Sequence, residues 1–408
     1  MGDRRRPSRV DLRRYDRMKQ RFLGYGRQTI DDADIAAVVD VLRGDFLTQG
    51  PAVERFETAL ADRVGAKHAI AVANGTAALH LACLAAGLKA GDVAVAPTMT
   101  FVATANAPLY CGARTELVDI GRHNLGLTAD ILRAALASHP ETKAVLPVYF
   151  AGLADGAAEL AAAADGRTII ADACHALGGV YEDGGPVGSC QHCDMSVFSF
   201  HPVKPITTAE GGAVTTNDSE LARRLQILRN HGIERDPARF VDQADDEAGP
   251  WQHQQQALGF NYRMTDIQAA LGLAQLDKLD AMLARRRQIA AYYDARLGNL
   301  ENIVLPQSEL AARARSGLHL YLLHIDFAAL GITRPEAMTQ LRDRGIGTQV
   351  HYIPVHRQPF HRDRIAGTPG DFPVSEQYYR GALSIPFFPS MTDHEVEFTV
   401  AAIKDLVQ

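Results

Sequence analysis

Short apolar runs alternate with amphipathic segments through the first half of the chain. The runs are apolar at nearly every position, which is typical of strands buried on both faces of a sheet. The segments between them repeat apolar residues at helical spacing. This alternation predicts an α/β fold with a parallel or mostly parallel sheet covered by helices. The expected strands are 68–73, 92–96, 115–119, 144–149 and 168–172, and the expected helices are 77–86, 102–110, 129–136 and 157–164.

Two amphipathic helices are expected before the first strand, at 34–42 and 53–64. Thr29 or Asp31 can cap the first helix and Gly44 can end it.

The second half of the chain is less regular. Residues 231–259 are polar, which predicts a loop over a site or an interface. A long helical stretch at 264–297 is expected to bridge to a smaller α/β region. The other expected elements are strands at 195–200, 213–215, 318–326 and 347–353, and helices at 218–230, 334–344 and 392–406.

These patterns predict a basic extension and three folded segments. Residues 1–21 hold nine Lys or Arg and three Asp. We expect a disordered extension there, and binding of nucleic acid or acidic lipid is the alternative. The expected segments are 1–21, a large domain at 22–260, a linking helix at 261–298 and a small C-terminal domain at 299–408.

Composition narrows the class of protein. Hydrophobic residues make up 47% and charged residues 22%, as in ordinary soluble proteins. The net charge of −6 argues against a general binder of nucleic acid or anionic membrane. No apolar run approaches the ~20 residues of a membrane helix, and the first residues lack the apolar core of a signal peptide. We therefore expect a cytoplasmic protein.

The five cysteines are odd in number and irregularly spaced, which fits free thiols in a reducing compartment. Cys190-Gln191-His192-Cys193 has CxxC spacing. Structural zinc or redox chemistry is the lesser alternative there, because no second ligand pair lies at a suitable distance. We expect no metal site.

Lys204 is the first candidate for chemistry. It follows an apolar strand-like run and precedes a loop of small residues, within DMSVFSFHPVKPITTAEGG (194–212). Desolvation disfavours an ammonium group, so a lysine at such a place can act as nucleophile and proton carrier. The alternative is an ordinary surface lysine at the end of a strand.

Two other strand ends carry polar residues. Asn74-Gly75-Thr76 precedes a helix, where amides, a hydroxyl and the helix dipole suit a phosphate, although the same residues also make a good helix cap. Asp172 ends a buried strand and needs a cation or strong donors, or it caps a helix. Neither GxxxxGK[ST] nor a strand-linked GxGxxG is present.

Together these residues suit pyridoxal 5′-phosphate. The phosphate needs amides and hydroxyls, the ring nitrogen needs an anion such as Asp172, and the aldehyde needs an amine such as Lys204. Phe101 offers an aromatic face for the ring.

Several segments carry a family resemblance in order and spacing. They are FLTQGPAVERFE (46–57), NGTAALHLA (74–82), PTMTFVATANA (97–107), DACHALGG (172–179), FSFHPVK (198–204), EGG (210–212) and GFNYRMTDIQAALG (259–272). From about Gly24 to Leu406 the chain resembles the DegT/StrS-type sugar aminotransferases, a branch of the fold-type I pyridoxal-phosphate enzymes. The resemblance implies a large sheet domain and a small C-terminal α/β domain.

The resemblance also implies roles for matching residues. Lys204 would bind the cofactor's aldehyde and carry the proton, Asp172 would pair with the ring nitrogen, and His175 would lie against the ring or its phenolic oxygen. Asn261 would reach the phosphate of a partner subunit, so a homodimer would share its active sites. Phe101 would stack on the ring, and Gly75, Thr76 and Ser199 would bind the phosphate.

Within the family, YGRQ (25–28), HGIERD (231–236), VHYIPVHRQP (350–359) and ALSIPFFPSMTD (382–393) resemble the branch that acts in pseudaminic acid biosynthesis. That branch aminates C4 of a UDP-linked 4-keto-6-deoxy-N-acetylhexosamine, with glutamate as donor. A lysine at 204 favours transamination over the sugar dehydration of relatives that carry histidine there.

The chain also departs from the family pattern. Ala209 stands where a glycine is expected, Pro205 follows the lysine, and 252–254 lacks expected aromatic residues. The alternatives are another nucleotide keto sugar, a ketone of secondary metabolism, or a regulatory DNA-binding role of the basic extension. Three further residues could face the sugar or belong to a structural turn: His351, Tyr352 and His356.

Overall fold

A seven-stranded sheet forms the centre of the computed structural model, which describes residues 22–242, 249–364 and 368–407. The strand order is β1-β7-β6-β5-β4-β2-β3. Only β7 runs antiparallel to its neighbours within this sheet, so the predicted mostly parallel α/β fold is confirmed. The strands are β1 (His68–Val72), β2 (Val93–Pro97), β3 (Arg114–Val118), β4 (Thr142–Val145), β5 (Thr168–Asp172), β6 (Met195–Ser199) and β7 (Gly212–Thr216).

Helices cover both faces of the sheet because successive strand residues point to opposite sides. Ile70, Val72 and Ile170 pack with helices α3, α4 and α7 on one face. Ala69, Ala71 and Ala171 pack with α2 and α8 on the other, where α5 and α6 cover the far strands. These helices are α2 (Pro51–Val64), α3 (Gly75–Ala85), α4 (Val102–Tyr110), α5 (Ala129–Ser138), α6 (Ala157–Ala163), α7 (Ser219–Leu228) and α8 (Asp266–Asp277).

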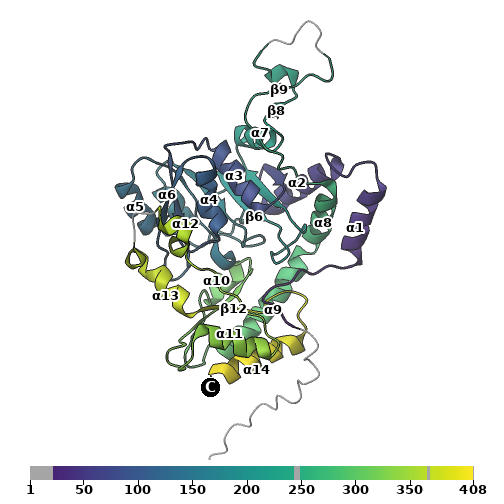
Figure 1. The fold of residues 1–408 in the computed structure, drawn as a ribbon. Coiled ribbons are helices and arrows are strands. Elements are labelled where there is room, and N and C mark those ends of the chain that lie inside the picture. Colours follow the sequence, from purple (N-terminus) through teal and green to yellow (C-terminus); the bar gives the residue numbers. More distant parts are fainter. Residues whose placement is uncertain (1–21, 243–248, 365–367, 408) are drawn as a thin grey trace, which may run out of the picture.

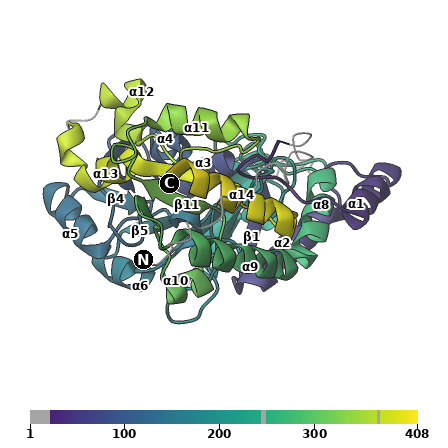
Figure 2. The same ribbon diagram turned by 90° about the horizontal axis from the view of Figure 1, so that it is seen from below.

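A smaller antiparallel sheet lies at the end of the molecule opposite the hairpin β8–β9 (Figure 1). Its apolar face packs against α9, α11 and α14, and Figure 2 shows α14 running across this end. The elements are β10 (Ile303–Val304), β11 (Tyr321–Ile325), β12 (Ala382–Ile385), α9 (Leu279–Leu297), α10 (Leu310–Arg315), α11 (Arg334–Asp343), α12 (Pro359–Arg362), α13 (Pro373–Gly381) and α14 (Asp393–Val407).

The strand predicted at 347–353 is wrong. Its one pairing is a bridge between Gln349 and Ser384, and the edge of the small sheet is β12 instead. Beyond this bridge, residues 349–353 line the cavity described below and pair with no strand. The strand predicted at 144–149 is also too long: β4 ends at Val145, and only a single bridge from Val148 to Asp172 continues it.

The single helix predicted at 264–297 is two helices, α8 and α9, which meet at Lys278. The Lys278 ammonium contacts the carboxylates of Asp31 and Asp34 at the start of α1 (Asp32–Arg43). These ion pairs tie the break to α1, whose N-cap is the predicted Asp31 and whose last residue precedes the predicted Gly44.

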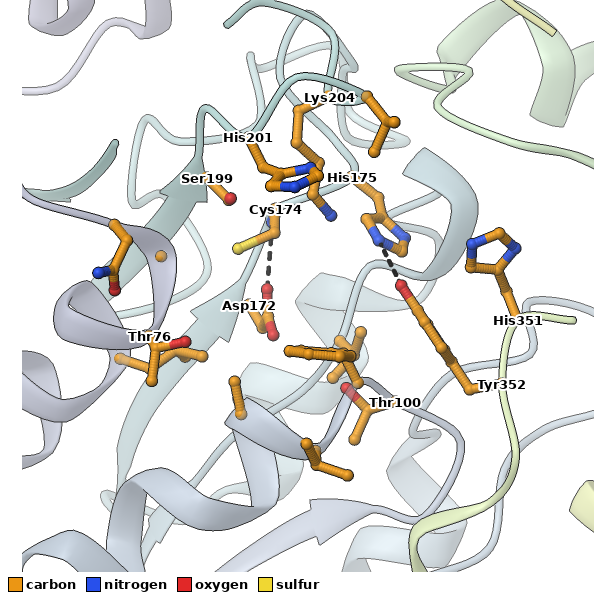
Figure 3. Close-up of a pocket in the computed structure, with 18 of the residues that line it drawn as sticks. Thr76, Thr100, Asp172, Cys174, His175, Ser199, His201, Lys204, His351 and Tyr352 are labelled. Atoms are coloured by element: carbon orange, nitrogen blue, oxygen red, sulfur yellow. Dashed lines mark hydrogen bonds between the residues drawn. The ribbon is translucent and has the colours of Figure 1, made fainter. Parts of the chain in front are cut away.

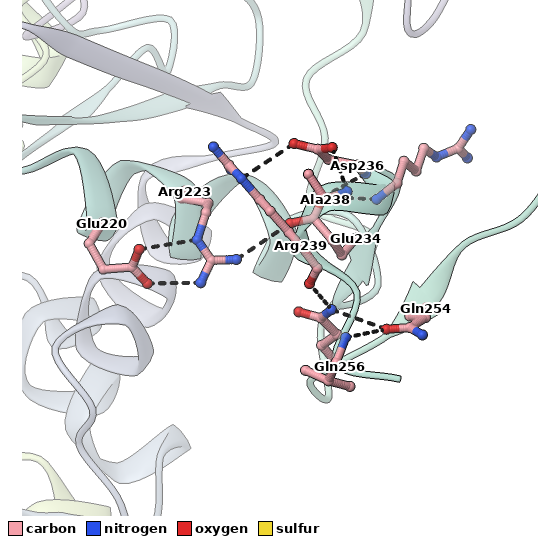
Figure 4. Close-up of polar contacts among 10 residues, drawn as sticks. Glu220, Arg223, Glu234, Asp236, Ala238, Arg239, Gln254 and Gln256 are labelled. Atoms are coloured by element: carbon pink, nitrogen blue, oxygen red, sulfur yellow. Dashed lines mark hydrogen bonds and ion pairs between the residues drawn. The ribbon is translucent and has the colours of Figure 1, made fainter. Parts of the chain in front are cut away.

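The polar segment predicted as an irregular loop contains a hairpin of β8 (Ile233–Glu234) and β9 (Gln254–Gln255), which projects from the body (Figure 1). Figure 4 shows its attachment: Arg223 of α7 pairs with Glu220 and with Glu234 of β8. Glu234 in turn accepts two backbone N–H bonds, from Arg235 and Asp236. The charged network therefore fixes the direction in which the hairpin leaves α7.

Two predictions about domain organisation remain untested. The domain boundaries at 22–260, 261–298 and 299–408 stay predictions, and the extension 1–21 lies outside the described residues. Among the described residues, no helix combines the length and the hydropathy that crossing a membrane requires.

Ala209 adopts the left-handed conformation, with φ of 65°, at the position where the family pattern has glycine. Its side chain is exposed, and its N–H donates to Thr207 Oγ1 at 3.0 Å. The backbone conformation of this loop, rather than side-chain packing, therefore favours glycine at position 209. A left-handed residue other than glycine costs roughly 1–2 kcal/mol.

Ala209→Gly is expected to raise the free energy of unfolding by about 1 kcal/mol, after the greater entropy of glycine in the unfolded chain is subtracted. Urea unfolding of the purified protein measures it. Ala33→Gly, at an exposed position inside α1, is the matched control and should lower the same quantity by up to about 1 kcal/mol. A loss at both positions would contradict the argument.

Candidate active site

A cavity of about 1060 Å³ opens at the carboxyl ends of β1, β5 and β6, where ligands collect in sheets of this type. The structure brings seven predicted site residues into the lining of this cavity: Gly75, Thr76, Phe101, Asp172, His175, Ser199 and Lys204. The eighth, Asn261, is exposed and lies outside the lining, where its backbone pairs with that of Asn230.

The start of α3 forms an anion cradle. Asn74 caps the helix by accepting from Ala77 N at 2.8 Å, and Gly75 is its first residue. A Cβ on Gly75 would lie 2.9 Å from Ser199 Cβ, so only glycine lets the Ser199 hydroxyl lie beside the helix start. Amides, hydroxyls and the positive helix end together suit a phosphate.

Asp172 is buried at the end of β5, and its carboxylate has neutral donors. It accepts from Thr104 Oγ1 at 2.6 Å and from Cys174 N at 3.1 Å. The Thr104 hydroxyl is also 2.8 Å from Thr100 Oγ1. A buried carboxylate that faces a cavity with neutral donors alone is suited to pair with a cationic group there. Sequence reasoning missed Thr104; its spacing of four from Thr100 at a helix start was the available signal.

His175 is fixed in one orientation. Its Nδ1 accepts from Ala151 N at 3.2 Å, which assigns the ring proton to Nε2. Nε2 then donates to the Tyr352 hydroxyl at 3.1 Å, a contact drawn in Figure 3. Burial and the nearby Lys204 charge lower the pKa of His175 well below its usual range, so the imidazole is neutral.

Two more histidines lie beside His175. The His319 ring is 4.4 Å away between centroids, and its buried Nδ1 has no partner among the described residues. His351 Nδ1 contacts Ser384 Oγ at 2.8 Å. Burial lowers the pKa of His351 to about 3 and that of His319 well below its usual range. The cavity wall is therefore neutral on this side.

Lys204 extends into the cavity between His201 and His175 (Figure 3). The backbone N–H of Lys204 donates to the backbone oxygen of His201 at 2.9 Å. The buried Pro205 then restricts the backbone of the turn that follows. Burial lowers the pKa of Lys204, while the nearby Asp172 carboxylate opposes that change. A lowered pKa increases the fraction of neutral amine, which is the nucleophilic form.

The three residues that could face the sugar or belong to a structural turn have different places in the structure. His351 and Tyr352 line the cavity, whereas His356 does not. His356 is buried between Thr98 Oγ1 and Glu376 Oε1, each at 2.8 Å, and therefore serves the structural turn. The lining residues that sequence reasoning missed include Tyr25, His80, Thr100, Tyr262 and His319.

The CxxC segment lies away from this cavity. Within the described ranges, no three His, Cys, Asp or Glu side chains gather closely enough to hold a metal ion.

Residues 28–404 match the DegT/DnrJ/EryC1/StrS aminotransferase family, and the chain belongs to this family. The spore coat polysaccharide biosynthesis protein SpsC of Bacillus subtilis is 37% identical over 395 residues, which cover 96% of this chain and 98% of SpsC.

Solved structures agree with this assignment. Helicobacter pylori PseC, an aminotransferase in the biosynthesis of pseudoaminic acid, has a TM-score of 0.84 at 28% identity and covers 95% of this chain and 99% of its own. The PMP form of the putative sugar aminotransferase Spr1654 from Streptococcus pneumoniae has a TM-score of 0.84 at 27% identity, with 94% and 98% covered. Its PLP form scores 0.83 at 27% identity, with 95% and 100% covered.

The chain is therefore a sugar aminotransferase of fold type I that depends on pyridoxal phosphate. The residues fit this cofactor because the cavity joins a cradle that a Cβ at Gly75 would fill, a buried carboxylate with neutral donors and a lysine whose pKa is lowered.

Acid is expected to destabilise the fold through the buried histidines. His175, His319 and His351 have folded pKa values below the ordinary 6.5, so only the unfolded chain binds their protons below that pH. The free energy of unfolding should fall between about pH 6.5 and pH 5 by up to roughly 1.4 kcal/mol per pH unit for each histidine. Urea unfolding at several pH values measures this slope. A free energy that is constant or rises toward pH 5 would contradict it.

Proposed function

We propose that this enzyme moves an amino group from L-glutamate to C4 of a UDP-linked 4-keto-6-deoxy-N-acetylhexosamine, giving UDP-4-amino-4,6-dideoxy-N-acetyl-altrosamine for pseudaminic acid biosynthesis. The proposal is carried by the meeting of Lys204, Asp172 and the cradle at one cavity. The likeness to PseC over nearly the whole chain supports the choice of sugar.

When bound, the cofactor supplies an aldehyde and a ring that withdraws electrons. Lys204 Nζ would hold the aldehyde until the amine of the amino donor displaces it. The freed Lys204 amine would then accept the proton from Cα of the donor and, in the second half of the reaction, would give a proton to C4 of the sugar. Asp172 would keep the ring nitrogen protonated, and the bonds from Thr104 Oγ1 and Cys174 N hold its carboxylate in place. His175, neutral and oriented by Ala151 N, lies against the ring or its phenolic oxygen.

Phe101 and Tyr352 would bound the space that the cofactor ring takes in this proposal. Phe101 is 57% exposed although it lines the cavity, and its ring centroid is 6.1 Å from that of Tyr352. An aromatic ring held at a cavity edge can stack on a planar cofactor. Gly75, Thr76 and Ser199 bind the phosphate in this proposal.

The charge of the cavity supports a shared site. Among the described residues that line it, Lys204 is the only lysine or arginine. A nucleotide diphosphate and a glutamate bring several negative charges, so one subunit offers few cations to receive them. We infer a homodimer in which Asn261, exposed beside the projecting hairpin, reaches the phosphate cradle of the partner. The free cysteines support a cytoplasmic location.

Lys204→Ala tests the chemistry. It should remove the visible absorbance of the bound cofactor and lower kcat at least about 100-fold, because the proton carrier is lost. Absorbance spectra and product mass measured with glutamate and the UDP-4-keto sugar provide the readouts. Lys67→Ala, at an exposed lysine before β1, is the control and should retain both. Full turnover by Lys204→Ala would overturn the assignment.

A panel of UDP- and dTDP-linked keto sugars tests the substrate separately. The 4-keto-6-deoxy-N-acetylhexosamine should give the highest kcat/KM, and glutamate should exceed other amino donors. Preference for another nucleotide keto sugar, or for a small ketone, would leave the chemistry standing and replace the sugar.

Mixed dimers test the shared site. Lys204→Ala and Asn261→Ala should each be poorly active alone. In a mixed dimer, one site receives both substitutions and the other receives neither. Refolding or coexpressing the two variants together should therefore restore about a quarter of wild-type activity in a symmetric dimer. Activity equal to the average of the two separate variants would contradict sharing.

A further inference from the structure

Cys190 and Cys193 lie above one cross-strand pair of the large sheet. Ser196 of β6 and Thr215 of β7 are directly opposite each other in the register. Cys193 Sγ is 3.2 Å from Ser196 Oγ, and Cys190 Sγ donates to Thr215 O at 3.2 Å. Side chains of directly opposed residues lie about 4.5–5.5 Å apart at Cβ, so these contacts bring the two sulfurs together.

The loop that carries the thiols is held in place. His192 Nε2 lies 2.8 Å from Asp183 Oδ2, and Gln191 Nε2 donates to the same oxygen at 2.7 Å. The His192 ring also packs edge-on against Tyr181, with centroids 4.9 Å apart. The two residues between the cysteines are therefore directed toward Asp183, and both thiols are directed toward the sheet.

We propose that Cys190 and Cys193 form a reversible dithiol–disulfide site that reacts with low-molecular-weight disulfides. The Cys190 thiolate attacks one sulfur of the small disulfide and releases one small thiol. Cys193 then attacks the mixed disulfide and releases the second. Two protein thiols lose two electrons and two protons, one S–S bond forms in the loop, and the small disulfide is reduced to two thiols.

The order of attack follows from the surroundings of each sulfur. The hydrogen bond between the two thiols lowers the pKa of Cys190 and raises that of Cys193 well above its usual range. Both residues are partly exposed. A thiol of lowered pKa beside a second thiol is the arrangement of an attacking and a resolving cysteine.

The site is separate from the cavity, so its test does not depend on the proposed substrate. It lies at the opposite end of β6 from Ser199, and the two cysteines do not line the cavity. A metal is a poorer reading of the pair, since no third ligating side chain joins it within the described residues.

Glutathione disulfide is the probe, and counting free thiols by mass spectrometry is the readout. Cys111→Ser serves as the starting protein because Cys111 contacts Cys83 and offers a second pair. Of its four thiols, two should be lost as one internal disulfide, and dithiothreitol should restore them. Adding Cys193→Ser should trap one glutathione on Cys190. Adding Cys190→Ser should leave no internal disulfide and should slow the loss of the remaining thiols at least tenfold.

Two results would overturn the proposal. One is retention of all four thiols by the folded starting protein. The other is loss of thiols at an unchanged rate after Cys190→Ser, which would place the attacking thiol elsewhere. The cofactor absorbance, followed in the same samples, shows that each variant is folded. A proposed function that failed would leave this thiol count unchanged.

Discussion

The close approach of three backbone segments governs the rest of the structure. A Cβ on Gly212 would lie 2.6 Å from the carbonyl carbon and oxygen of Asn74, and one on Gly75 would meet Ser199. Gly212 is also opposite Ser199 and Val72 in the sheet. Because β7 runs antiparallel between β1 and β6, its first residue lies beside the last residues of both strands. As a result the cradle and the strand that leads to Lys204 meet at one edge.

The ionisable groups that this packing brings together differ in their surroundings. The Asp172 carboxylate accepts bonds from neutral donors, while burial lowers the pKa of the surrounding imidazoles and keeps them neutral. A protonated His175 would compete for the carboxylate and repel the lysine. With the imidazoles neutral, Lys204 is the only lysine or arginine among the described lining residues, so the histidines offer no positive charge to compete with a cationic ring nitrogen beside Asp172.

Sequence patterns predicted much of this because strand ends are local features. Alternation gave the sheet, and polar residues after apolar runs gave Lys204, Asp172 and Gly75. Other features depend on distant contacts. The break at Lys278 depends on ion pairs with α1, and the segment 347–353 abandons the strand pattern where it lines the cavity. Thr104 was missed because its hydroxyl acquires meaning only from the carboxylate that folding brings to it.

The residues proposed for amino-group transfer and those proposed to select the sugar lie on different kinds of segment. The groups proposed to act on the amino acid lie at strand ends that the sheet fixes to each other. The segment 349–353 lines the same cavity but lies outside the large sheet. We expect substitutions there to change the accepted sugar without moving Lys204 or Asp172. Residues 252–254, where β9 begins, do not line the cavity of their own subunit, so the lack of aromatic residues there leaves the arrangement of Lys204 and Asp172 unchanged.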